Sequence, residues 1–434
     1  MDLVSLVCCD LGSIVRGRSL AATELAAHMG RGVGWVPANH ALTPLGPLAE
    51  PNPFGSIGDL RLLPDASTHV RLDAQPAPLE LVLCDIVETD GEPWECCPRR
   101  YLRDTLETLQ GELGARALVS FEHEFQLLGG AHEAPGLPFS LEAQRRVHPF
   151  PSLVMGALHD AGLEPERFFA EFASHQFEVP TAAAEGIRSA DRSVLFKEIV
   201  REVARREGRR ASFVPLFDPA QAGNGVHIHV RLIDGEGSSL LFDASRPGCL
   251  SELGGSFAAG VLRHAPALSA LTAASPVSFE RLAPHHWGAG AVCLSQRNRE
   301  ALLRIPPLLT LGGEDPHAQL RLEYRAADAT ANPYLALGSI IRAGLAGTRE
   351  QLAAPPLLEA DPATLQGEEA ERFGVGALPS SLAGALDALG ADEVARGWFA
   401  PLLYDAYVSV KRAELAAVAD LDLTASCRLY ADAY

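Results

Sequence analysis

Basic residues are scarce in this chain of 434 residues, where 36 lysines and arginines stand against 55 aspartates and glutamates, a net charge of −19. This charge repels phosphate backbones and anionic lipid surfaces, so neither nucleic acid nor membrane is expected as a partner. Hydrophobic residues make up 47% and charged residues 21%, close to the globular average, which excludes disordered and fibrous classes. The length predicts two or three domains.

Cysteine motifs and long apolar runs are also missing. The eight cysteines include no C-x-x-C pair, which argues against structural zinc and a disulfide framework and indicates reduced thiols. The N-terminus has no basic signal region, and the apolar stretch 334–347 is too short to span a bilayer. We therefore expect a cytoplasmic protein.

Common nucleotide and hydrolase motifs do not occur. There is no G-x-x-x-x-G-K-[ST] loop, and the G-N-G at 223–225 lacks the third glycine of a dinucleotide fingerprint. H-E-x-x-H and G-x-S-x-G are absent as well. If ATP binds, metal ions and arginines must hold its phosphates.

Apolar runs at 3–9 and 79–86 enclose a segment rich in proline and glycine, which predicts a small, β-rich N-terminal domain over residues 1–97. Leucines then recur at helical spacing, so a second domain is predicted over residues 98–434. Within it we predict a helix from Asp191, its N-cap, to Glu207, followed by Gly208.

Three predicted strands, at 119–127, 225–232 and 320–325, alternate apolar and polar residues, so each carries its charges on one face. The charged faces hold Glu122, Glu124, His227, His229, Arg231, Arg321, Glu323 and Arg325. One such strand is usually half exposed to solvent. Three that combine carboxylates, imidazoles and guanidiniums indicate a single polar cavity wall that binds hard cations and an anionic ligand.

Two further segments fit the same cavity, although each alone is more often surface charge. One carries Glu171 and Glu178, and the other carries Arg299 and Arg304 and leads into a strand. Oxygen-rich ligand sets with one histidine favour Mg²⁺ or Mn²⁺.

Taken in order, these segments resemble the glutamine synthetase family and its γ-glutamyl-amide ligases, such as the γ-glutamylanilide, γ-glutamylpolyamine and γ-glutamylethanolamine synthetases. The matching motifs are F-E-H-E-F at 121–125, the segment 171–178, G-N-G-V-H-I-H at 223–229, E-R-L-A-P at 280–284, N-R at 298–299 with R-I-P at 304–306, and R-L-E-Y-R at 321–325 with N-P-Y-L at 332–335. The resemblance implies an α+β fold, with a small β-grasp-like N-terminal domain and a catalytic domain whose curved antiparallel sheet is flanked by helices. It also implies a homo-oligomer, commonly a double hexameric ring with sites shared between subunits.

The resemblance further implies ATP, L-glutamate and two divalent metal ions, Mg²⁺ or Mn²⁺, at each site. The first ion would be held by Glu124, Glu171 and Glu178, and the second by Glu122, His227 and Glu323. Glutamate would be held by Gly223, Arg281 and Arg325, and the ATP phosphates by His229, Arg299, Arg304 and Arg321. In this chemistry the glutamate γ-carboxylate takes the ATP γ-phosphoryl group, and an amine then displaces phosphate from the acyl phosphate.

The nitrogen-donor site departs from that of ammonia-using members. Trp287 stands where their flap glutamate falls, and the N-terminal D-G-S-S segment with its ammonium-binding aspartate is missing. Losing two anions and gaining an indole favours a larger apolar or aromatic amine, aniline foremost, stacked on Trp287. Alkyl amines and ethanolamine remain open because His285 or His286 can act as the base near neutral pH. The alternative is that Trp287 only packs the flap and that both histidines are solvated.

Three other functions explain parts of the pattern. An ammonia-using glutamine synthetase conflicts with Trp287, whereas a metal-dependent hydrolase would not need so many arginines. A non-catalytic assembly protein of this family should have lost metal ligands, yet all six positions are intact. We therefore predict an ATP-dependent ligase that joins L-glutamate to a small organic amine.

Overall fold

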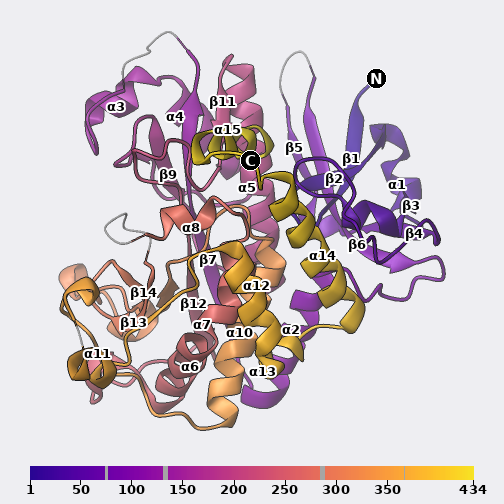
Figure 1. Ribbon diagram of the computed structural model, residues 1–434. Coiled ribbons are helices and arrows are strands. Elements are labelled where there is room, and N and C mark those ends of the chain that lie inside the picture. Colours follow the sequence, from indigo (N-terminus) through magenta and orange to yellow (C-terminus); the bar gives the residue numbers. More distant parts are fainter. Residues whose placement is uncertain (74–76, 131–134, 284–288, 366) are drawn as a thin grey trace.

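A computed structural model describes residues 1–73, 77–130, 135–283, 289–365 and 367–434. Two β-sheets organise the chain, one near the N-terminus and a larger one in the remainder, against which most helices pack (Figure 1). The predicted α+β fold class is confirmed. No helix in the described ranges is long and apolar enough to cross a membrane.

The N-terminal sheet has the strand order β2-β1-β6-β4-β3, with β5 paired to β6. Its strands are β1 (Leu3–Cys9), β2 (Val15–Ala21), β3 (Val33–Trp35), β4 (Leu60–Pro64), β5 (Val70–Leu72) and β6 (Leu79–Glu88), and α1 (Leu25–His28) follows β2. The central strands β1 and β6 are parallel, and the other pairs are antiparallel. Buried apolar residues such as Leu6, Leu62 and Val82 form its core.

The larger sheet has the order β16-β13-β14-β15-β12-β7-β9-β8, and β10 and β11 also pair with β7. Its strands are β7 (Arg116–Leu128), β8 (Phe169–Ala170), β9 (Gln176–Pro180), β10 (Ala184–Glu185), β11 (Arg210–Ser212), β12 (Val226–Ile233), β13 (Ala291–Ser295), β14 (Ala301–Arg304), β15 (Leu322–Tyr324) and β16 (Gly376–Ala377). It is antiparallel except for the parallel pair β13 and β14. The three strands predicted to share a polar wall are the neighbours β7, β12 and β15.

The helices of the same part are α2 (Pro98–Leu113), α3 (Leu141–Arg146), α4 (Phe150–Asp160), α5 (Ile187–Arg206), α6 (Glu252–Arg263), α7 (Ala265–Thr272), α8 (Ser278–Arg281), α9 (Pro316–Gln319), α10 (Pro333–Arg349), α11 (Glu368–Arg372), α12 (Leu382–Ala391), α13 (Glu393–Arg396), α14 (Pro401–Ala417) and α15 (Leu423–Ala433). The apolar stretch 334–347 lies in α10, which is buried against α2, α5, α6 and α7. Asn332 caps α10 by accepting hydrogen bonds from the amides of Tyr334 and Leu335.

The predicted start of α5 is wrong. The helix begins at Ile187, and Asp191 lies buried inside it instead of capping it. The Asp191 carboxylate accepts hydrogen bonds from Arg99 at 2.9 Å and from the Tyr334 hydroxyl at 2.7 Å, so it serves as the counter-ion of a buried guanidinium. The predicted end holds, because Gly208 follows the helix with a positive φ of 67°.

Arg99 joins the two sheet regions. Its guanidinium lies 2.7 Å from Asp65, which follows β4, 3.0 Å from Asp85 in β6 and 2.9 Å from Asp191 in α5. The Arg99 side chain is only 3% exposed. A second buried cation, Lys197 in α5, donates to the Ser13 hydroxyl at 2.8 Å, so polar contacts fix the N-terminal sheet against the larger domain.

Candidate active site

A cavity of about 560 Å³ lies on the polar face of the larger sheet. Every predicted site residue that the structure describes lines it, namely Glu122, Glu124, Glu171, Glu178, Gly223, His227, His229, Arg281, Arg299, Arg304, Arg321, Glu323 and Arg325. His285, His286 and Trp287 fall outside the described residues. The sheet therefore gathers side chains that are up to about 200 positions apart in the sequence.

Strand register explains this convergence. The pairing places His227 opposite Glu122, His229 opposite Glu323, and Glu124 opposite Glu178. Directly paired residues on neighbouring strands point to the same face of a sheet. The alternating apolar residues of these strands, among them Phe121 and Ile228, lie buried on the opposite face.

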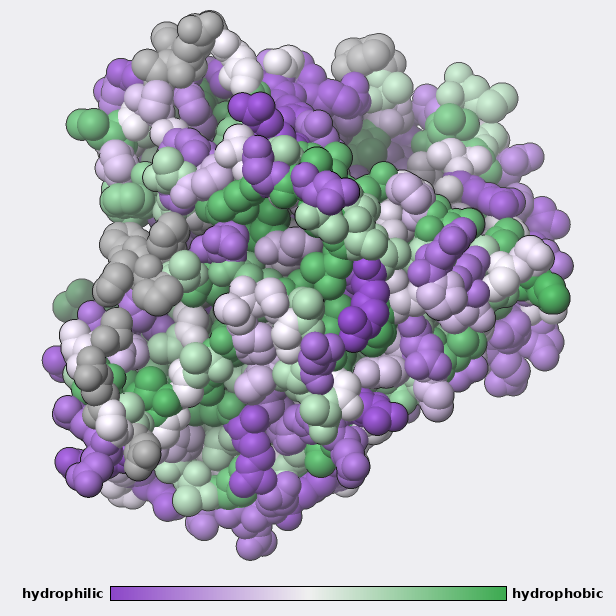
Figure 2. Space-filling view, in the orientation of Figure 1, coloured by the Kyte–Doolittle hydropathy of each residue, from purple (hydrophilic) through white to green (hydrophobic). Residues whose placement is uncertain are grey.

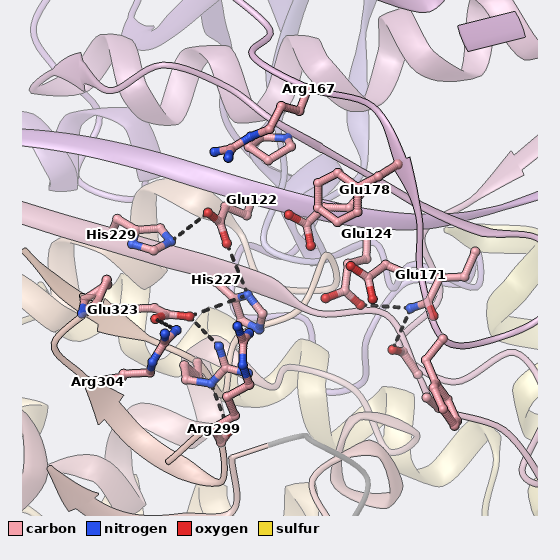
Figure 3. A pocket seen from close by; sticks show the side chains of 18 of the residues that line it. Glu122, Glu124, Arg167, Glu171, Glu178, His227, His229, Arg299, Arg304 and Glu323 are labelled. Atoms are coloured by element: carbon pink, nitrogen blue, oxygen red, sulfur yellow. Dashed lines mark hydrogen bonds and ion pairs between the residues drawn. The ribbon is translucent and has the colours of Figure 1, made fainter. Parts of the chain in front are cut away.

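Three carboxylates gather on one side of the cavity, from Glu124, Glu171 and Glu178 (Figure 3). Burial and the nearby Glu124 raise the pKa of Glu171 to about 8, and burial with Glu122 and Glu124 raises the pKa of Glu178 to about 10. Such crowding of hard oxygen donors is costly unless protons or cations neutralise it. In ligand type this donor set suits a divalent cation such as Mg²⁺ or Mn²⁺, whereas among the described residues only ligand atoms of Glu122, His229 and Glu323 already lie within 4.8 Å of one another.

Glu122, His227 and Glu323 form a second group. Nδ1 of His227 lies 3.4 Å from Oε2 of Glu122 and 3.9 Å from Oε1 of Glu323, so this nitrogen faces both carboxylates. Burial acts to raise the pKa of Glu122, but His229 and His227 outweigh burial and hold this pKa well below its usual range. Burial is likewise outweighed at Glu323, whose pKa Arg325 and His227 lower to about 2. This group offers two charged oxygens and one imidazole to a cation.

His229 lies beside the same group, and ligand atoms of Glu122, His229 and Glu323 fall within 4.8 Å of one another. However, Nε of Arg321 donates to Nδ1 of His229 at 3.1 Å. In the tautomer that accepts this bond the proton is on Nε2, which lies 3.1 Å from Oε1 of Glu122 but has no hydrogen-bond partner among the described residues. His227 is therefore the better metal ligand, and His229 is suited to donate to an anion.

Guanidinium groups form the other side of the cavity. Glu323 accepts a hydrogen bond from Arg304 at 2.7 Å and another from Arg325. Arg281 is buried and donates to the carbonyl oxygen of Ala327 at 2.9 Å. Nε of Arg281 and Nε of Arg304 are buried without a hydrogen-bond partner among the described residues. An anionic ligand would satisfy such donors.

Gly223 is required by close packing. A Cβ atom at this position would lie 2.1 Å from the carbonyl oxygen of Pro215 and 2.7 Å from Cγ of Arg281. No other residue fits without moving both the Pro215 backbone and the Arg281 side chain, so this glycine lets the two lie close together at the cavity.

Some cavity residues were not predicted. Gln176 donates to Glu124 at 2.9 Å and to the carbonyl oxygen of Gly223 at 2.9 Å, which fixes both groups. Its position two residues before Glu178 on β9 was a usable signal, because alternate residues share a face. The other unpredicted lining residues include Phe139, Arg167, Phe169 and Phe172. No motif in the sequence distinguishes these aromatic residues.

Comparison with known proteins agrees with this geometry. Residues 1–94 match the glutamine synthetase N-terminal domain, and residues 95–424 match the glutamine synthetase catalytic domain. The γ-glutamylpolyamine synthetase GlnA3 of Streptomyces coelicolor is 34% identical over 431 residues, covering 96% of this chain and 91% of that protein.

Two solved structures are also similar. A crystal structure of a "novel glutamine synthase homolog" has a TM-score of 0.92 and 44% identity, covering 100% of this chain and 98% of that one. A GmaS/ADP complex has a TM-score of 0.83 and 26% identity, covering 98% and 95% of the two chains.

Proposed function

The chain belongs to the glutamine synthetase family, and from this premise we propose that it joins the γ-carboxyl group of L-glutamate to an organic amine at the expense of ATP. One observation carries the proposal. Two sets of carboxylate-rich residues suited to cations and a set of arginines suited to phosphate come together in one cavity. Few other reactions need both at the same place.

The first proposed cation set is Glu124, Glu171 and Glu178, and the second is Glu122, His227 and Glu323. When bound, divalent ions there would neutralise phosphate charge and orient the phosphoryl group. Gly223, Arg281 and Arg325 are proposed to hold glutamate. His229, Arg299, Arg304 and Arg321 are proposed to bind the phosphates of ATP.

In the first step, a γ-carboxylate oxygen of glutamate attacks the γ-phosphorus of ATP, the bond from this phosphorus to the bridging oxygen breaks, and ADP leaves. In the second step, the amine nitrogen attacks the acyl carbon, the bond from carbon to the phosphate oxygen breaks, and phosphate leaves while the nitrogen loses a proton. The arginines stabilise the negative charge of the transferring group. Exclusion of water protects the acyl phosphate from hydrolysis.

For the amine we propose an apolar or aromatic compound, with aniline the favoured candidate and alkyl amines or ethanolamine next. Trp287 in place of a flap glutamate supports this choice, since an indole attracts a hydrophobic amine and offers no anion to ammonium. The similar protein from Streptomyces coelicolor, by its name, makes a γ-glutamyl amide other than glutamine. Ammonia-using glutamine synthetase activity is the second candidate, because the family domains carry that name.

Phosphate release tests the proposal. The protein is given ATP, Mg²⁺ and glutamate with ammonium, ethanolamine, a diamine, isopropylamine or aniline, and each product is identified by mass spectrometry. We expect turnover with an organic amine to exceed turnover with ammonium. A preference for ammonium would support the second candidate, and no turnover with any amine would favour a non-catalytic assembly protein.

A further inference from the structure

A second cavity, of about 640 Å³, is lined mainly by apolar residues. Its walls come from α8, β13, α11 and β16, and the first three of these are labelled in the left half of Figure 1. The largest apolar side chains that line it are Phe279, Leu282, Leu365, Val375 and Leu378. Small-molecule sites in proteins commonly have volumes of about 300 to 1,000 Å³, so the size suits a small organic ligand.

The apolar wall is anchored in the core of the domain. Phe279 and Leu282, both on or next to α8, are each only 6% exposed. Leu365 and Val375 pack against a small buried cluster that includes Cys293 on β13. Side chains that pack on buried neighbours hold their positions, so this wall is a fixed surface of the fold.

The charges in this cavity have one sign, unlike those of the active-site cavity. Glu280, Glu300 and Asp361 are the charged residues among the described lining residues, which include no lysine, arginine or histidine. Asp361 already has an interaction of its own, whereas Glu280 and Glu300 form no ion pair within the described ranges. An anion would be repelled here. A cation would be attracted by the carboxylates, and the Phe279 ring is compatible with a cation as well.

The two cavities share two short segments of the chain. Arg281 and Arg299 line the active-site cavity, whereas the residues next to them, Glu280 and Glu300, line the second cavity. At the end of α8 and just before β14, neighbouring residues of opposite charge therefore serve different cavities. A ligand in the second cavity would contact the same segments that carry two arginines of the active site.

We infer that the second cavity binds an organic cation with an apolar body, through the carboxylates of Glu280 and Glu300 and the apolar wall. Its acidic lining selects against glutamate and ATP, the anionic substrates of the proposed reaction. The inference goes beyond the proposed function and does not depend on it, because it rests on the lining of a separate cavity.

Isothermal titration calorimetry with butyltrimethylammonium tests the inference. This cation has an apolar chain, and its quaternary nitrogen cannot be acylated as a substrate amine would be. We expect saturable binding to the intact protein in the presence of Mg²⁺, with a Kd below about 1 mM. Tetramethylammonium, which lacks the chain, should bind at least about tenfold more weakly. Butanesulfonate, which has the same chain and the opposite charge, should not bind.

Glu280→Gln and Glu300→Gln should each weaken the binding of butyltrimethylammonium by about fivefold, because an amide of similar size replaces a carboxylate. Glu252→Gln is the matched control, since Glu252 is exposed on α6, lies 3.5 Å from Arg246 and does not line the cavity. Equal affinity of all four proteins would place the cation elsewhere and overturn the inference. Equal binding of butanesulfonate would overturn it too, and so would the absence of saturable binding, as expected if a neighbouring subunit fills the cavity.

Phosphate release from ATP, measured with glutamate and an amine, remains the separate readout of the proposed function. An active ligase that does not bind the cation would refute the inference and retain the proposed function. A protein that binds the cation through Glu280 and Glu300 but releases no phosphate would retain the inference and lack the proposed function.

Discussion

Glu178 illustrates how the sheet concentrates charge at single residues. It lies opposite Glu124 in the register of β7 and β9, and burial together with neighbouring carboxylates raises its pKa to about 10. A bound cation stabilises the charged form of such a buried carboxylate more than that of an exposed one, because the cation offsets both the cost of desolvation and the repulsion from the neighbouring carboxylates.

We therefore predict that Glu178→Gln reduces ligase activity by at least about 100-fold, since an amide replaces a charged oxygen donor. Addition of Mg²⁺ should raise the melting temperature of the unchanged protein and have a much smaller effect on the variant. Glu185→Gln is the control, because Glu185 is exposed on β10 and pairs with Arg116 at 2.7 Å. Equal Mg²⁺ responses in all three proteins would contradict the assignment.

His40 provides a pH-dependent prediction outside the site. The ring is fully buried beside Trp94, and neither ring nitrogen has a hydrogen-bond partner within the described part of the chain. Burial, with a smaller contribution from Arg16, lowers the pKa of His40 to about 3 from an ordinary value of 6.5. Below pH 6.5 His40 therefore binds a proton in the unfolded chain but stays neutral in the folded protein. As a result, the free energy of unfolding decreases as the pH is lowered.

When the pH is lowered from 8 to 5, the free energy of unfolding of the unchanged protein should decrease by about 2 kcal/mol more than that of the His40→Phe variant. Urea denaturation at the two pH values measures this difference at fixed protein concentration. If His40 were charged in the folded protein, this pH-dependent difference between the two proteins would have the opposite sign. His28, a histidine on α1 that is not buried, provides the control variant His28→Phe, for which we expect little pH-dependent difference.

At the residue scale, alternation along β7, β12 and β15 predicted seven of the charged or titratable side chains that line the cavity, but it placed Arg231 with them, and Arg231 is not among the lining residues. Glu171, Glu178, Arg299 and Arg304 were predicted from two further charged segments, and Arg281 only from the family resemblance.

Alternation could not separate the roles of His227 and His229, which both contact Glu122. That distinction depends on the hydrogen bond from Arg321, a long-range contact that no local pattern encodes. Phe139 and Phe172 escaped prediction because an exposed phenylalanine in a loop looks like any other loop residue.

Among the elements, α2 presents two adjacent arginines in opposite environments. Arg99 is buried among three aspartates from both sheet regions. Arg100 is 36% exposed, and its one ion pair within the described ranges is with Asp104, at 2.6 Å on the same helix. A buried ion network loses far more than a surface pair when one member is removed, because the remaining charges stay buried.

Arg99→Ala should consequently lower the free energy of unfolding by about 3 to 5 kcal/mol, while Arg100→Ala should lower it by less than about 1 kcal/mol. Chemical denaturation followed by circular dichroism provides the comparison. Equal losses in the two variants would show that the aspartates around Arg99 are stabilised by solvent instead of by the guanidinium.

The sequence patterns predicted α2 and the strands β7, β12 and β15 to within a few residues, because apolar spacing reports directly on burial. They misplaced the start of α5, since an aspartate that pairs with a distant arginine is indistinguishable from a capping aspartate in the local sequence. The parallel pairing of β13 and β14 was not expected either. Strand direction depends on the whole path of the chain between the two strands.

On the scale of the whole molecule, one hydrophobic region of the surface is a candidate contact between subunits. Figure 2 shows hydrophobic side chains gathered near the middle of one face, around α8 and α15, with hydrophilic ones more common toward its margins. Leu421 and Leu429, just before and on α15, are 42% and 37% exposed. Apolar surface of this kind is typical of contacts between subunits.

We predict that the protein is a homo-oligomer, and a double hexameric ring would have twelve times the mass of the 46.2 kDa chain. Light scattering coupled to size exclusion measures the mass directly. Leu429→Asp should reduce the mass by placing a charge in an apolar contact, whereas Leu153→Asp on α4 is the exposed control. A monomeric mass for the unchanged protein would exclude a shared site.

Glu323 occupies the boundary between the two sides of the cavity, bonded to Arg304 and Arg325 and facing His227. A phosphate drawn to Arg304 competes with Glu323 for the positive charge of this guanidinium and leaves the carboxylate more available to a cation beside His227. A cation there, in turn, withdraws Glu323 from Arg304 and leaves this arginine with more positive charge for phosphate. Thermodynamic linkage requires the two effects to be equal, so nucleotide and metal must each increase the affinity of the site for the other by the same factor.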